Sequence, residues 1–177
     1  MIGYINSGFV GSLDDRKRTY GFLFHLGSGV ISWTSKKQPI VKPSSVEAEY
    51  VATTSTACQA VWLRRVFYGL KQKQQGSTTI YCDNTSTIAL SKNSVFHHKS
   101  KHIDIRYHFI RELVSNGEVH LKTYKSSDQL VDIFTKSLEK YVLEFHRRNL
   151  CVVRLAETRR VGMFEFSRVM SYFNTPP

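Results

Sequence analysis

The sequence is poor in acidic residues and contains no long apolar stretch. Its 177 residues include 14 Asp and Glu against 25 Lys and Arg, which gives a formal net charge of +11. No run of about 18 apolar residues exists, and no basic region followed by an apolar one opens the chain, so neither a membrane span nor a secretory signal is visible. We therefore expect an intracellular protein, in the cytoplasm or the nucleus.

Cysteine is also scarce. Cys58, Cys82 and Cys151 are far apart, odd in number and outside any C-x-x-C arrangement. This spacing suggests neither a disulfide framework nor a zinc site. We interpret the three as buried thiols in a reducing compartment.

The length and composition indicate one globular domain. Apolar residues make up 41% and charged residues 22% of the chain, close to the average for folded domains. We expect one domain over residues 1–153 and a basic C-terminal tail of unknown role over 154–177. The tail carries four arginines and two glutamates, so most of the positive charge belongs to the domain.

The excess of positive charge predicts a polyanionic partner. Nucleic acid is the leading candidate. An anionic membrane surface is the alternative, but it would favour a single basic amphipathic helix, whereas the basic residues here are spread over several elements. We therefore expect nucleic acid as the partner and no membrane association.

Hydrophobic periodicity predicts a mixed α/β fold, in which three antiparallel strands are followed by parallel strands with flanking helices. A hairpin is expected where Gly27-Ser28-Gly29 turns the chain. The expected strands are 2–10, 19–26, 30–34, 78–82 and 119–123, and the expected helices are 44–69, 84–90, 102–115 and one that begins after Ser126 and reaches Leu138.

The long helix places a carboxylate among its buried residues. Its start is marked by the capping-box spacing Ser44-x-x-Glu47. The expected inward stripe, at steps of three and four residues, is Glu49, Thr53, Thr56, Ala60, Leu63, Phe67 and Leu70. A buried Glu49 should be neutral, paired or bound to a cation. The alternative is that Glu49 lies near enough to the helix start for water to reach it.

Two aspartates are further candidates. Asp83 directly follows the fourth strand, where ligands gather in mixed sheets, although an ordinary turn acid explains it as well. Asp132 lies four residues after Asp128 in the last helix, on the face opposite Leu130, Ile133, Phe134 and Leu138, and a solvated helix face is its alternative. A mixed sheet could bring these two acids and Glu49 to one point, and converging carboxylates are what Mg²⁺ requires.

A basic segment lies between Lys92 and Arg111, with Asp104 as its one acid. It is a candidate for phosphate contact, and a solvated helix face is the alternative. His97 and His98 are poor metal ligands, because adjacent side chains rarely converge and no cysteine nearby completes a site.

Several blocks of residues together resemble a known family, the ribonuclease H domain of copia-type LTR retrotransposon Pol polyproteins. The resemblance covers about residues 3 to 153. The blocks that carry it are Leu13-Asp14-Asp15-Arg16-Lys17, Ile31-Ser32-Trp33, Lys36-Lys37-Gln38-Pro39, Ser44-Ser45-Val46-Glu47-Ala48-Glu49-Tyr50, Tyr81-Cys82-Asp83-Asn84, Lys101-His102-Ile103-Asp104-Ile105-Arg106-Tyr107-His108 and Asp128-Gln129-Leu130-Val131-Asp132-Ile133.

The resemblance implies a five-stranded ribonuclease H-like sheet and cleavage of the RNA strand of an RNA–DNA hybrid. In that family four acids hold two Mg²⁺ ions, and three of them correspond to Glu49, Asp83 and Asp132. The first acid is missing: where the family reads Gly-Tyr-Ser-Asp-Ala-Asp-Trp, this chain reads Gly3-Tyr4-Ile5-Asn6-Ser7-Gly8-Phe9. Asn6 thus occupies the position of the metal-bridging aspartate, and Gly8 replaces a second acid.

The change at Asn6 predicts weakened binding of Mg²⁺ or Mn²⁺ and impaired catalysis, because a two-metal mechanism requires both ions to be held in place. The expected partner is an RNA–DNA hybrid or another nucleic acid. The candidate contacts are Lys36, Lys37, Lys99, Lys101, His102 and Arg106. A non-catalytic nucleic-acid-binding module and an inactive transposon relic remain as alternatives.

Overall fold

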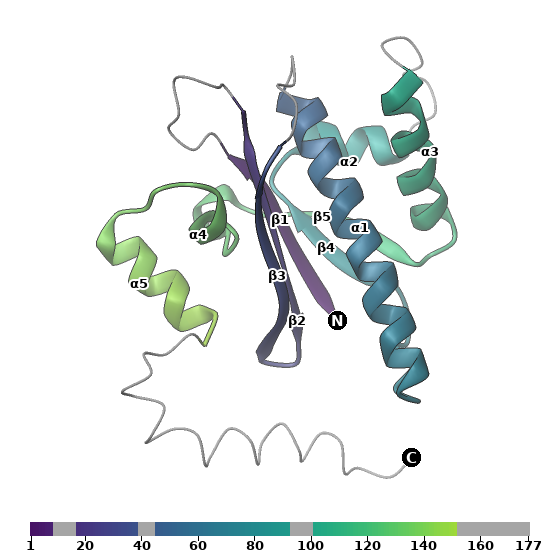
Figure 1. The fold of residues 1–177 in the computed structure, drawn as a ribbon, viewed down its shortest axis with the longest axis horizontal. Coiled ribbons are helices and arrows are strands. Elements are labelled where there is room, and N and C mark those ends of the chain that lie inside the picture. The colour runs from purple at the N-terminus through teal and green to yellow at the C-terminus, as the bar shows by residue number, and fades with distance from the viewer. Residues whose placement is uncertain (9–16, 39–44, 93–100, 152–177) are drawn as a thin grey trace.

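A five-stranded mixed sheet forms the centre of the molecule, with helices on both faces (Figure 1). The computed structural model describes residues 1–8, 17–38, 45–92 and 101–151. The strands are β1 (Ile2–Gly8), β2 (Thr19–Leu26), β3 (Gly29–Lys37), β4 (Thr78–Cys82) and β5 (Val119–Thr123). Their order in the sheet is β3-β2-β1-β4-β5.

The strand directions confirm the predicted mixed sheet. β1 pairs antiparallel with β2, and β2 pairs antiparallel with β3. β1 and β5 each pair parallel with β4, with Tyr4 opposite Tyr81 and Tyr81 opposite Lys122. The predicted hairpin joins β2 to β3 at Gly27, whose φ of 61° is a left-handed conformation that glycine adopts without strain. Short connections therefore build one half of the sheet, and helical crossovers build the other.

The helix α1 (Ser45–Gly69) covers one face of the sheet and ends where the sequence predicts. Thr53 and Thr56 are fully buried on its inner side, and their hydroxyls donate to the carbonyls four residues earlier at 2.8 and 2.9 Å, which satisfies them without water. The assignment of Leu70 to the buried stripe is wrong. Leu70 is 64% exposed because it follows the last helical residue.

Two shorter helices lie on the same side of the sheet as α1 (Figure 1). Helix α2 (Thr85–Lys92) begins after Asn84, whose Oδ1 accepts a hydrogen bond of 3.1 Å from the amide of Thr87. Helix α3 (Lys101–Ser115) packs against α1 and buries Ile110. Both helices confirm the predicted elements and close a core between α1 and the sheet.

The C-terminal region differs from the predicted single helix. A short 3₁₀ turn, η1 (Ser126–Asp128), is followed by α4 (Asp132–Thr135) and then by α5 (Lys140–Asn149) on the opposite face of the sheet (Figure 1). Residues 129–131 separate η1 from α4, and the first of them is Gln129. Its backbone is extended, and its buried side chain donates through Nε2 to the carbonyl of Ile5 at 2.9 Å, which holds this segment against β1.

This division overturns the alternative that Asp132 lies on a solvated helix face. Asp132 is the first residue of α4 and is 5% exposed, whereas Asp128 is exposed. Leu130 is buried as expected, and Ile133 and Phe134 are partly buried against the same small core. Helix α5 was not expected from the sequence, because no side-chain cap marks its start.

One of the three cysteines is buried. Cys82 is a buried thiol, whereas Cys58 and Cys151 are exposed, so the prediction of three buried thiols is wrong for those two.

The expected tail, residues 154–177, lies outside the described residues. Within the part of the chain that the structure describes, no helix is both long and apolar enough to cross a membrane.

Helix α4 approaches the sheet through two glycines. A Cβ atom on Gly8 would lie 2.7 Å from the carbonyl oxygen of Thr135, and one on Gly21 would lie 2.9 Å from the Thr135 methyl group. The atom nearest to a Cβ atom on Gly8 belongs to the backbone of α4, so this clash could be relieved only by a shift of the helix. An acidic side chain at position 8, which the resemblance leads one to expect, does not fit beside α4 as it packs here.

We predict that Gly8→Ala lowers the free energy of unfolding by about 1–3 kcal/mol, since it overpacks the contact between β1 and α4. Urea denaturation measures the change. Gly29→Ala is the matched control, because a Cβ atom there meets nothing within 4 Å. Equal stability of the two variants would contradict the close packing of α4.

Candidate active site

The candidate site lies at one edge of the sheet, where several elements end or begin. β1 and β4 are parallel, so their carboxyl ends reach the same edge. Asn6 lies near the end of β1, Asp83 directly follows β4, Glu49 lies near the start of α1, and Asp132 begins α4. The structure thus brings to one edge four residues that are separated by up to 126 positions in the sequence.

Glu49 is held at this edge by β1. Its side chain is 4% exposed, and its Oε1 accepts a hydrogen bond of 2.9 Å from the backbone amide of Ser7. Its other oxygen, Oε2, is buried and has no hydrogen-bond partner among the residues that the structure describes. The alternative of a water-exposed Glu49 near the helix start is therefore wrong.

The surroundings of Glu49 favour its protonated form. Burial, with a smaller contribution from the negative charge of Asp83, raises the pKa of Glu49 to about 8. The Ser7 amide and the positive charge of Arg18 act in the opposite direction. A cation near the unpartnered oxygen would offset the burial and would release the proton.

Asp83 and Cys82 complete a small cluster with Glu49. One ligand atom from each of the three lies within 4.8 Å of the others. Asp83 is partly exposed, and its Oδ2 accepts a hydrogen bond of 3.2 Å from Ser126. Burial raises the pKa of the Cys82 thiol to about 12, so the sulfur stays protonated and is a poor ligand for a hard cation. The sequence analysis did not assign Cys82 to the site, although its place directly before Asp83 is a signal.

Asp132 is engaged on the other side of β1. Its Oδ1 accepts a hydrogen bond of 2.5 Å from the side-chain amide of Asn6, and its Oδ2 lies 2.6 Å from the ammonium of Lys136. Sequence reasoning also missed Lys136, although its spacing of four residues from Asp132 in a helix favours an ion pair.

These contacts show which residues fit a divalent cation. Glu49 and Asp83 fit, because they provide neighbouring carboxylates and a buried oxygen without a partner. Asp132 fits less well, because each of its oxygens already has a donor, and one of these donors is the ammonium of Lys136. β1 thus lies between Asp132 and the pair formed by Glu49 and Asp83.

Basic residues lie near the same edge. β3 runs parallel to β1, so Lys36 and Lys37, which are exposed at its carboxyl end, face the edge that carries Asp83. Arg106 is exposed on α3. Lys101 and His102 begin α3, but their side chains, like all of Lys99, lie outside the described residues. Arg18, which lies close enough to Glu49 to lower its pKa, was not singled out from the sequence.

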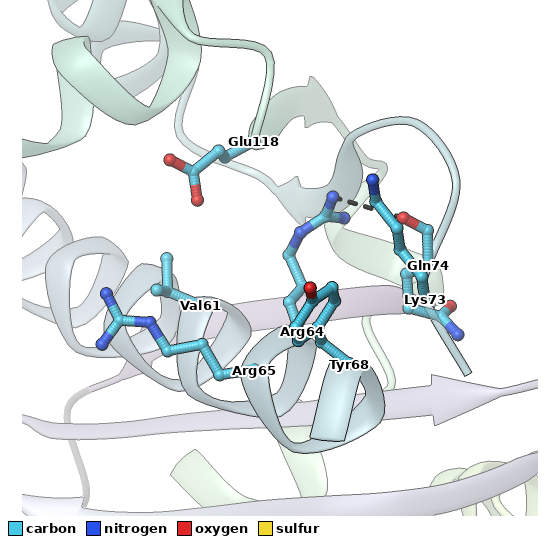
Figure 2. Close-up of a pocket in the computed structure, with 7 residues that line it drawn as sticks. All are labelled: Val61, Arg64, Arg65, Tyr68, Lys73, Gln74 and Glu118. Carbon is cyan, nitrogen blue, oxygen red and sulfur yellow. Dashed lines mark hydrogen bonds between the residues drawn. The ribbon is translucent and has the colours of Figure 1, made fainter. Parts of the chain in front are cut away.

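A surface cavity of about 200 Å³ lies at the far end of α1 (Figure 2). Its lining residues are Val61, Arg64, Arg65, Tyr68, Lys73, Gln74 and Glu118. Arg64 is committed to the fold, because it donates to the carbonyls of Gly76 and Gln74 and to the hydroxyl of Thr78. Thr78 is the first residue of β4, whereas Asp83 follows the last residue of that strand. The cavity and the acidic edge therefore lie at opposite ends of β4.

The order of the strands in the mixed sheet and the helices that flank it are those of a ribonuclease H-like fold. Similar solved structures are the N-terminal RNase H domain of a Mycobacterium tuberculosis protein, with a TM-score of 0.53 at 12% identity, and RNase H1 from Halobacterium salinarum, with 0.52 at 12%. The first alignment covers 83% of this chain and 96% of that chain, and the second covers 76% and 92%.

Sequence comparison identifies the group more closely. A retrovirus-related Pol polyprotein from transposon TNT 1-94 of Nicotiana tabacum is 40% identical over 144 residues, or 80% of this chain. A Pol polyprotein from transposon RE2 of Arabidopsis thaliana is 36% identical over 152 residues, or 86%. No family model matches. The chain is therefore a homologue of copia-type retrovirus-related Pol polyproteins, and it spans 11% and 10% of these two relatives.

The raised pKa of Glu49 predicts a pH-dependent stability in the absence of metal. The folded protein retains the Glu49 proton between the ordinary value of 4.5 and about 8, whereas the unfolded chain loses it. This contribution to stability is therefore complete below pH 4.5 and is lost as the pH rises to about 8. Glutamine does not ionise, so Glu49→Gln should remove this loss of stability with rising pH. Relative to the natural chain, the free energy of unfolding of the variant should rise by about 1 kcal/mol per pH unit over this range.

Urea denaturation in the presence of a chelator, at several pH values, measures this difference. Glu139→Gln is the control, because Glu139 is exposed at the start of α5. A constant difference between Glu49→Gln and the natural chain would show that Glu49 ionises normally in the fold.

Proposed function

We propose that this chain is a ribonuclease H-type domain of retrotransposon origin that binds nucleic acid through its basic surface but cleaves RNA–DNA hybrids poorly. The observation that carries the proposal is the contact between Asn6 and Asp132. At the position where the family has its first acid, this chain has an amide that donates a hydrogen bond to another site residue.

The basic surface supports nucleic-acid binding. Lys36 and Lys37 extend from the carboxyl end of β3 beside the acidic edge, so a phosphate backbone held by them would pass close to Glu49 and Asp83. One of the similar solved structures is an RNase H1 in complex with an RNA/DNA hybrid, with a TM-score of 0.53 at 11% identity. We infer that a hybrid or a related nucleic acid binds here.

The residues of the site support only part of the cleavage chemistry. A divalent cation, when bound by Glu49 and Asp83, would stabilise negative charge on a phosphate oxygen. Ser7 positions the Glu49 carboxylate through its amide, and Ser126 positions Asp83 through its hydroxyl. Asn6 contributes no charge, and it directs its N–H group to Asp132 instead of leaving that carboxylate available. The site therefore lacks the negative charge that a second cation would require.

We expect hybrid cleavage by the natural chain to be at least about 10²-fold slower than by Asn6→Asp, because the substitution restores the missing carboxylate. A cleavage assay with a labelled RNA–DNA hybrid, in Mg²⁺ and in Mn²⁺, measures both rates. Asp83→Asn in the Asn6→Asp background controls for contaminating nuclease. Equal and rapid cleavage by the natural chain would contradict the impairment, and failure of both proteins to cleave while hybrid binding persists would favour a non-catalytic binding module.

For binding, we expect the double variant Lys36→Gln, Lys37→Gln to weaken hybrid affinity and to reduce the slope of log K against log salt by about 1 to 2, since each phosphate contact contributes to that slope. Fluorescence anisotropy measures both. The matched control is Lys71→Gln, Lys73→Gln, which removes the same charge from exposed residues after α1, at the opposite edge of the sheet. Equal losses in the two variants would indicate a general charge effect and would contradict a surface at the acidic edge.

A further inference from the structure

Each oxygen of the Asp132 carboxylate has a close partner. Its side chain is 6% exposed, with Asn6 Nδ2 2.5 Å from Oδ1 and Lys136 Nζ 2.6 Å from Oδ2. Asn6 Nδ2 also lies 3.5 Å from the hydroxyl of Thr135, the last residue of α4. Asn6 therefore contacts both ends of this short helix.

The carboxylate of Glu49 has the opposite environment. One oxygen accepts from the Ser7 amide, and the other is buried and has no hydrogen-bond partner within the described part of the chain. Its nearest charged neighbour in the cluster is the carboxylate of Asp83, and two carboxylates within 4.8 Å repel each other unless a proton or a cation lies between them. The positive charge of Arg18 acts on Glu49 but does not outweigh burial and the charge of Asp83, whereas Asp132 has an ammonium in direct contact.

We propose that the substitution at Asn6 has divided the site into two parts with different roles. Glu49 and Asp83 form a binding site for one divalent cation. Asp132 is a structural residue that joins α4 to β1 through Asn6, and the ammonium of Lys136 supplies its counter-charge. This proposal deepens the proposed function and rests on the same site.

Charge and geometry explain why Asp132 is withdrawn from metal binding. A cation that approached Asp132 would have to displace an ammonium and an amide N–H from a nearly buried carboxylate. An aspartate at position 6 has no N–H to donate when ionised, so it would leave Oδ1 of Asp132 without its donor and would add a second carboxylate. Lys136 is 43% exposed and can turn toward solvent, which would leave this pair of carboxylates to a cation.

The test is the stoichiometry and affinity of Mn²⁺ for the full chain without nucleic acid, measured by electron paramagnetic resonance of the unbound ion. We expect one ion for the natural chain and two for Asn6→Asp. Asp132→Asn should still bind one ion with an affinity within about twofold, whereas Glu49→Gln and Asp83→Asn should lose affinity by about tenfold or more. Circular dichroism confirms that each variant is folded.

Three results would overturn the proposal: no Mn²⁺ bound by the natural chain, two ions bound by it, or a loss of affinity in Asp132→Asn equal to that in Glu49→Gln. Because no nucleic acid is present, these results are independent of hybrid binding. A chain that binds one Mn²⁺ but no hybrid would contradict the proposed function and leave the division of the site intact.

A second measurement tests the structural role of Asp132. Lys136→Met should lower the melting temperature by several degrees and leave Mn²⁺ binding unchanged, because it removes the counter-charge of Asp132 and touches neither Glu49 nor Asp83. Lys136→Arg should restore the stability. Lys140→Met is the matched control, since Lys140 is exposed at the start of α5. Equal melting temperatures for Lys136→Met and Lys140→Met would contradict the structural role.

Discussion

The parallel pairing of β1 with β4 is the constraint on which the site depends. It places the carboxyl ends of both strands at one edge of the sheet, so that Asn6 and Asp83 are neighbours in space. The start of α1 lies at the same edge and brings Glu49 to the Ser7 amide. Without this pairing, acidic residues that are distant in the sequence would also be distant in space, and one cation could not contact two of them.

The docking of α4 is the second requirement, and it depends on small residues and on buried polar contacts. Gly8 and Gly21 let the helix approach the sheet closely, while Gln129 binds the backbone of β1. Asn6 adds a further contact from β1 to Asp132. Because a short helix of four residues has little stability of its own, these contacts decide where Asp132 lies. The amide at position 6 therefore gives β1 a hydrogen bond to α4.

Much of the fold was predictable, because local patterns agree with the tertiary structure. β2, β4 and β5 follow their apolar and aromatic runs, α1 ends at Gly69, and Asn84 caps α2. The C-terminal region was less predictable. The spacing of Leu130, Ile133 and Phe134 suits a continuous helix, but the buried Gln129 side chain interrupts it through a contact with Ile5, which is distant in the sequence. Helix α5 has no side-chain cap, so its start carried no local signal.

The sequence by itself determined which residues could carry chemistry: Glu49 on an inward stripe, Asp83 after a strand, Asp132 near the C-terminal end, and an amide at position 6 where an acid is expected. The resemblance to copia-type polyproteins rests on the same residues. Only the tertiary structure decided their partners, since Ser7, Ser126 and Asn6 each contact an acid more than forty residues away. The interaction of an acidic side chain with its partner depends on a distance of a few ångströms. These distances are set only when the sheet is formed and α4 is packed against it.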